Sequence, residues 1–208
     1  MTKITSILAV VGLVFSCLIL IAQASNPPTS LGNPNFPNNL EIPAGIAVDL
    51  TLNKFSFSLC LVGGIGFKCN TATSTWDFVG PTGLLANECK DFRKVPDDPK
   101  FITAITFDTE SVTNAGLRSE VSPDDTSTAI FTREAAVNSP NPSVDTTWLR
   151  SNASGQTGNG KFAQVTYLQR VLTTGGLPPP TSQCGSIYSN NYIYSARYRA
   201  TLLFYVAK

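Results

Sequence analysis

The sequence predicts an all-β chain: a single-domain antiparallel β-sandwich or barrel with long loops rich in glycine, proline and asparagine. Three observations favour this fold. Apolar and polar residues alternate with a period of two along several short runs, as in strands with one buried face. Turn-forming residues separate the runs, and no stretch combines a period of 3.6 with helix caps. The 208 residues are enough for one domain with its own core.

The N-terminal residues 1–24 have the composition of a signal peptide. Lys3 precedes an apolar run over residues 7–21, and Ala22-Gln23-Ala24 closes that run with small side chains. This order predicts cleavage after Ala24, with retention as an anchor as the alternative. We therefore expect a protein of the secretory pathway, in a vacuole lumen or outside the cell, with no membrane attachment after cleavage.

The next segment, residues 25–41, is rich in asparagine and proline. Proline fixes φ and removes an amide donor, so this segment is expected to be an extended arm and not a helix. The single β domain is then expected over residues 42–208.

The strands of this domain are expected in order, with turns between them. Gly63-Gly64-Ile65-Gly66 is expected to be a tight turn, and Gly80-Pro81 is expected to end a strand. Loops are expected at 138–143 and 151–160. The last strand is long, aromatic and free of glycine and proline, which favours a central position in the sheet. The expected strands are residues 46–52, 55–61, 75–79, 101–107, 127–132, 144–149, 161–172 and 192–206.

Charged residues make up only 14% of the chain, with 15 Lys and Arg against 14 Asp and Glu. An average globular domain has about 25%. Loss of Lys3 with the signal peptide would balance the charges. No basic stripe exists to hold phosphates, so nucleic acid is not an expected partner. A neutral surface repels itself little, which favours association with other copies of the chain.

The chain contains no histidine, which excludes Ser-His-Asp and Cys-His catalysis and the usual histidine metal sites. No glycine-rich nucleotide-binding motif is present. We therefore predict that the protein is not an enzyme and uses no cofactor and no metal. The weaker alternative is a glycoside hydrolase, whose two carboxylates must lie roughly 5–10 Å apart. Its candidates are Asp49, Asp77, Asp108, Glu110 and Glu120.

Of the five cysteines, Cys17 would leave with the signal peptide. The others are expected to form disulfides in an oxidising compartment, with three possible pairings if all are internal. Bonds between chains are the alternative. These cysteines are Cys60, Cys69, Cys89 and Cys184.

Two further features concern carbohydrate. Trp76, Trp148, Tyr192 and Tyr194 could stack on sugar rings, although such residues more often belong to a core or its rim. Asn152 starts an Asn-Ala-Ser sequon within an expected loop, so it is a candidate glycosylation site.

A series of motifs is shared with a known family. They include Gly66-Phe67-Lys68-Cys69, Gly158-Asn159-Gly160-Lys161-Phe162, Val165-Thr166-Tyr167-Leu168-Gln169-Arg170, Thr173-Thr174-Gly175-Gly176 and Tyr194-Ser195-Ala196-Arg197-Tyr198. On these motifs the chain resembles a family of secreted fungal and bacterial proteins of unknown function, whose members often carry a malate dehydrogenase label. The resemblance spans about residues 42–205. Residues 88–145 depart from it and lack the histidine-bearing segment of the relatives.

The resemblance implies a disulfide between Cys69 and Cys184. Cys60 and Cys89 would then be an extra pair, free to bond each other or another chain. Dehydrogenase activity is not expected, because the nucleotide-binding loop and a catalytic histidine are missing.

The leading hypothesis is a non-enzymatic structural protein of the secretory or vacuolar lumen. It would associate with itself through packing and disulfides, as a symmetric lattice requires. The resemblance extends in kind to a fungal protein of dense vacuolar crystals that serve in gravity sensing. The alternative is a secreted module that binds cell-wall polysaccharide or a cell surface.

Overall fold

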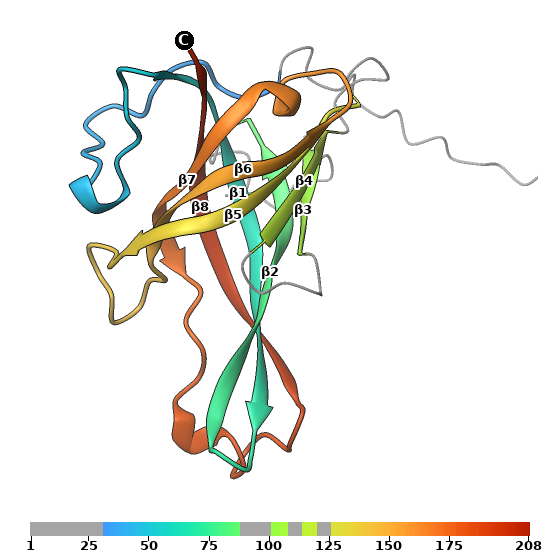
Figure 1. The fold of residues 1–208 in the computed structure, drawn as a ribbon. Coiled ribbons are helices and arrows are strands. Elements are labelled where there is room, and N and C mark those ends of the chain that lie inside the picture. Colours follow the sequence, from blue (N-terminus) through green and yellow to red (C-terminus); the bar gives the residue numbers. More distant parts are fainter. Residues whose placement is uncertain (1–30, 88–100, 108–113, 120–125) are drawn as a thin grey trace, which may run out of the picture.

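The computed structural model describes residues 31–87, 101–107, 114–119 and 126–208. They form one antiparallel sheet of eight strands that closes into a barrel, because β8 pairs with both β7 and β1 (Figure 1). The all-β prediction is confirmed, and the fold is a barrel. The strands are β1 (Asn53–Asn70), β2 (Thr75–Ala86), β3 (Phe101–Phe107), β4 (Asn114–Ser119), β5 (Thr128–Val137), β6 (Trp148–Thr157), β7 (Val165–Gly175) and β8 (Ile193–Ala207).

The helical elements of the described chain are short 3-10 turns of 3 residues each: η1 (Ala44–Ile46), η3 (Phe162–Gln164) and η4 (Thr181–Gln183). No helix in the described ranges has the length and apolar character needed to cross a membrane. The proposed signal peptide, residues 1–24, lies outside the described residues.

The interior of the barrel is filled at one end by phenylalanine rings. Phe57 on β1 stacks on Phe204 on β8 with ring centroids 4.6 Å apart, and Phe162 lies 5.5 Å from Phe204. All three side chains are fully buried. Alternate residues of each strand point inward, so the period-two pattern of β1 and β8 supplies this core directly. The long, aromatic β8 pairs on both sides, with β7 and β1, as every strand of a closed barrel does.

A second apolar cluster covers the outer surface of β6, β7 and β8, where residues before β1 pack on the sheet. Ile46 and Val48 lie there against Trp148 and Leu203. The Gln169 side-chain amide donates to the Ile46 carbonyl oxygen at 2.6 Å and accepts from the Tyr205 hydroxyl at 2.6 Å. Burial raises the pKa of Tyr205 to about 12, so its hydroxyl stays a hydrogen-bond donor at neutral pH.

The strand prediction for residues 46–52 is wrong, although Ile46 and Val48 are buried as expected. The segment begins within η1 and continues as a turn in which Asp49 accepts hydrogen bonds from the Thr51 amide at 2.8 Å and its hydroxyl at 2.6 Å. This side-chain bonding to local backbone competes with a strand ladder.

The glycine run at 63–66 is also different from its prediction, because it lies inside β1 and not in a turn. A Cβ atom on Gly63 would lie 1.9 Å from the Thr82 carbonyl oxygen of β2. The glycines therefore allow the backbones of the paired strands to approach closely. Likewise β2 continues through Gly80-Pro81, with a register shift opposite Gly66 and Phe67.

Two later boundaries differ too. Residues 151–157, expected as a loop, belong to β6, and residues 144–147, expected as a strand, precede it. Glycine and serine suggest loops, but here cross-strand pairing with β5 outweighs that local preference. The described part of the 25–41 arm is held to the barrel, since Leu31 is buried and Asn33 exchanges backbone hydrogen bonds with Ser58 at 2.8 and 2.9 Å.

Candidate functional site

One end of the barrel extends as a projection made by the β1–β2 hairpin, the start of β8 and the loop before β8 (Figure 1). Four aromatic side chains gather in this projection. We call them the aromatic tip, and they are Trp76, Tyr188, Tyr192 and Tyr194.

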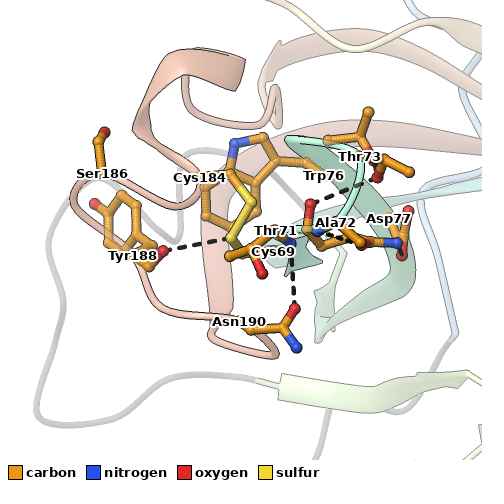
Figure 2. The surroundings of a disulfide bond; sticks show 12 residues. Cys69, Thr71, Ala72, Thr73, Trp76, Asp77, Cys184, Ser186, Tyr188 and Asn190 are labelled. Carbon is orange, nitrogen blue, oxygen red and sulfur yellow. Dashed lines mark hydrogen bonds between the residues drawn. A yellow bond between two sulfur atoms is a disulfide. The ribbon is translucent and has the colours of Figure 1, made fainter.

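A disulfide between Cys69 and Cys184 joins β1 to the loop that carries Tyr188 (Figure 2). Their Cα atoms are 5.4 Å apart, an ordinary spacing for a disulfide. The pairing implied by the family resemblance is therefore confirmed. Cys60 is also in a disulfide. Cys89, the partner proposed for it, lies outside the described residues.

Backbone hydrogen bonds hold the same loop to the end of β1. The Cys69 amide donates to the Tyr192 carbonyl oxygen at 2.9 Å, and the Asn191 amide donates to the Cys69 carbonyl oxygen at 2.8 Å. The Thr71 amide donates to the Asn190 side-chain oxygen at 3.1 Å (Figure 2). Asn191 has a φ of 65°, a conformation that asparagine tolerates better than most residues. The loop is thus fixed by covalent and hydrogen bonds together.

The four rings of the aromatic tip contact one another. Trp76 lies 5.3 Å from Tyr188 and 6.1 Å from Tyr194 between ring centroids, and Tyr188 lies 4.8 Å from Tyr192. The Trp76 indole N–H donates to the Pro180 carbonyl oxygen at 3.4 Å. Tyr192 is 45% exposed, whereas the other three rings are half-buried. The cluster therefore presents an aromatic surface to solvent, and ring contacts within the cluster hold that surface in place.

Neutral polar side chains surround these rings. Thr71, Thr73, Ser186 and Asn190 are exposed around the disulfide (Figure 2). One carboxylate, Asp77, lies among them, and it accepts a hydrogen bond from the Asn70 side-chain amide at 3.3 Å. Flat apolar faces bordered by hydroxyl and amide groups are suited to ligands that have both apolar faces and many hydroxyls.

The structure brings together three of the four aromatic residues proposed from the sequence. Trp76, Tyr192 and Tyr194 share the tip, whereas Trp148 is 5% exposed in the outer apolar cluster. Tyr188, the fourth residue of the tip, was not among the aromatic residues proposed from the sequence. Its signal was its position four residues after Cys184, because a disulfide from Cys184 to Cys69 places it beside the β1–β2 hairpin.

Of the carboxylates proposed for glycoside hydrolysis, the two that the structure describes, Asp49 and Asp77, are not brought together. Asp49 precedes β1. Asp77, on β2, lies opposite Lys68 in the strand register, near the other end of β1. A strand rises about 3.3 Å per residue, so the two acids lie on the order of 40–50 Å apart and cannot act as a pair. The hydroxyl and amide of Thr51 lower the pKa of Asp49, which is exposed. Asp108, Glu110 and Glu120 lie outside the described residues.

The glycosylation candidate Asn152 lies in the middle of β6, opposite Thr132 of β5 and Tyr167 of β7. Its side-chain oxygen is buried and has no hydrogen-bond partner. Glycosylation there stays a prediction. No group of three or more potential metal ligands occurs within the described ranges.

A family described as "Protein of unknown function (DUF3455)" matches residues 52–206, most of the chain. The chain therefore belongs to this family, which agrees with the resemblance to a family of unknown function. No curated protein and no solved structure shows significant similarity to it.

Proposed function

We propose that this member of the DUF3455 family is a non-enzymatic protein of the secretory pathway that binds neutral cell-wall polysaccharide through the aromatic tip. One observation carries the proposal: partly exposed aromatic rings lie at the end of a projection whose loop is anchored by the Cys69–Cys184 disulfide. A binding surface that is rigid before its ligand arrives loses little conformational entropy when the ligand binds.

The chemistry of the tip favours sugars over charged ligands. The face of Tyr192 can cover the C–H face of a pyranose ring, while Asn190 and Thr71 offer amide and hydroxyl groups nearby. The low charge of the chain, 14% of its residues, also suits an uncharged polymer. We expect contact with a β-linked glucan or chitin chain, along which successive sugars present flat faces.

Tyr192→Ala is expected to weaken binding to the polysaccharide by about three- to tenfold, since an aromatic contact contributes about 0.5–1.5 kcal/mol beyond its buried area. Tyr192→Phe, which keeps the ring, is expected to bind nearly as well as the wild type. Co-sedimentation with insoluble chitin, β-glucan and cellulose measures this. Phe36→Ala is the matched control, because Phe36 is 37% exposed and precedes β1 at its other end. Wild-type binding to none of the three polymers would refute the proposal.

Self-association is the second candidate function, and exposed apolar residues beside the N-terminal segment favour it. Leu50 and Leu52 are 59% and 68% exposed. Leu50 lines an open groove of about 590 Å³, whose walls also include Val48 and Phe55, and Leu52 lies two residues further along the chain. Exposed apolar groups of this kind mark association surfaces when they are contiguous. Assembly into dense particles is also what a likeness to octin, the protein of fungal vacuolar crystals used in gravity sensing, would imply.

This candidate predicts multimers held by packing. Cys60, Cys69 and Cys184 are already in disulfides, so they are not available to link one chain to another. We therefore expect the same multimers in samples without reductant and in samples with a low concentration of reductant. Sedimentation velocity across a range of protein concentrations measures their formation. Leu52→Asp, which places a charge on the apolar surface, is expected to give monomers. A wild type that stays monomeric at the highest soluble concentration would contradict self-association.

A further inference from the structure

The interior of the barrel contains a cavity of about 260 Å³ beside the phenylalanine core. Its walls are mainly apolar and include Leu61, Ile65 and Phe131. Three strands contribute polar side chains to the lining of this space: Arg133 on β5, which is exposed, and Arg170 on β7 and Tyr198 on β8, which are buried. The volume lies just below the roughly 300–1,000 Å³ of common small-ligand sites. We call this space the arginine chamber.

Arg170 is the buried charge of the arginine chamber. Its side chain is only 9% exposed. One terminal nitrogen, Nη2, donates to the Thr147 carbonyl oxygen at 2.8 Å and approaches the Thr147 hydroxyl at 3.5 Å. Its Nε is buried without a hydrogen-bond partner. Desolvation lowers the pKa of Arg170, although arginine keeps its charge in proteins.

No described carboxylate neutralises this guanidinium. The ion pair of the neighbouring strands joins Arg150 to Glu134 at 3.2 Å, and neither of these side chains lines the chamber. Tyr198 partly offsets the effect of desolvation on the pKa of Arg170, whereas Arg133, a charge of the same sign, lowers this pKa further. An isolated buried charge is strongly unfavourable unless a counter-charge accompanies it.

Tyr198 adds a second unsatisfied group to the same space. It is 3% exposed, and its hydroxyl is buried without a hydrogen-bond partner. Burial raises the pKa of Tyr198 to about 12, so the phenol stays protonated and can donate to an anion. The buried guanidinium and the phenol, which are close enough to affect each other's pKa, therefore face a cavity whose walls are mainly apolar.

We propose that the arginine chamber binds a small organic carboxylate with an apolar body. The carboxylate would pair with Arg170 and accept from the Tyr198 hydroxyl, with Arg133 adding positive charge, while the apolar body lies against Leu61 and Phe131. This ligand supplies what each group lacks: a counter-charge for the guanidinium, an acceptor for the phenol and apolar contact for the walls. The site is separate from the aromatic tip.

Titration calorimetry with octanoate and 1-octanol tests the charge requirement, because the two probes share an apolar chain. The wild type is expected to bind octanoate at least about tenfold more tightly than octanol, which corresponds to one charge-assisted contact. Arg170→Met keeps a long apolar side chain and is expected to remove this preference. Tyr198→Phe is expected to weaken octanoate binding about threefold. Arg197→Gln, at an exposed position of β8, is the matched control and should bind like the wild type.

Three outcomes would overturn the proposal: equal affinity for octanoate and octanol in the wild type, no octanoate binding at millimolar concentration, or full preference retained in Arg170→Met. Inorganic phosphate that competes with octanoate at equal concentration would also overturn it, since the apolar body would then contribute nothing. Should Arg170→Met fail to fold, the proposal is still tested by the difference between octanoate and octanol affinity in the wild type and by octanoate binding to Tyr198→Phe. Octanoate binding by Tyr192→Ala should be unchanged, which separates this site from the tip.

Discussion

Replacing Cys69 and Cys184 together by serine is expected to lower the free energy of unfolding by about 4–5 kcal/mol. The two residues are 115 positions apart in sequence, so the disulfide restricts a long loop in the unfolded chain. The chain-entropy account assigns the greatest stabilisation to such long loops. Urea unfolding followed by tryptophan fluorescence measures the change. Ser189→Ala, an exposed change in the same loop, is expected to alter stability by less than about 0.5 kcal/mol.

The same double variant should lose polysaccharide binding at temperatures where it is still folded. Without the disulfide, the loop that carries Tyr188 and Tyr192 has no covalent tie to β1 and is held by hydrogen bonds to Cys69, Thr71 and Trp76 and by ring contacts. Near-ultraviolet circular dichroism shows whether the barrel core persists under the binding conditions. A loss of stability below about 1 kcal/mol would contradict the structural role that we assign to this disulfide.

Phe204→Ala is expected to cost about 3–5 kcal/mol of stability, because it removes the ring to which the others of the interior core are joined. Phe204 is fully buried and contacts Phe57 at 4.6 Å, Phe162 at 5.5 Å and Phe131 at 6.2 Å between centroids. A neighbouring ring cannot move into the space without breaking its own contacts. The surrounding core therefore cannot collapse to fill the cavity.

Phe36→Ala provides the comparison for this variant in thermal and urea unfolding. Phe36 is 37% exposed and has an edge contact with Phe55 at 5.2 Å, so its loss is expected to cost less than about 1.5 kcal/mol. Equal effects of the two substitutions would show that the interior of the barrel is not the dominant core.

Much of the fold can be predicted from the sequence where one face of a strand is apolar. The alternation in β8 specifies both its length and its buried face, because Ala196, Tyr198, Ala200, Leu202 and Phe204 all point inward. The glycines at 63–66 were misjudged because local rules treat glycine as a turn former. Their role depends on β2, whose backbone lies against them. A prediction that considers only neighbouring residues in the sequence does not include such long-range pairing.

The sites were predictable to different degrees. The family motifs gave the Cys69–Cys184 pair, and from that pair the position of Tyr188 follows. The arginine chamber was missed, although Arg170 has the same strand parity as Leu168 and so belongs to the inward face of β7. An inward arginine indicates a buried charge only once the barrel is known to close. In an open sheet the same arginine could lie on a solvated face, where its charge needs no partner.

The most direct test of binding at the aromatic tip uses the two indole N–H resonances of the chain. Trp76 lies at the tip, whereas Trp148 is buried in the outer cluster and serves as an internal control. Proton–nitrogen spectra are recorded during titration with chitohexaose, laminarihexaose and cellohexaose. We expect that at least one oligosaccharide shifts the Trp76 resonance in a saturable way and leaves the Trp148 resonance in place. No shift of Trp76 with any of the three, or equal shifts of both tryptophans, would contradict it.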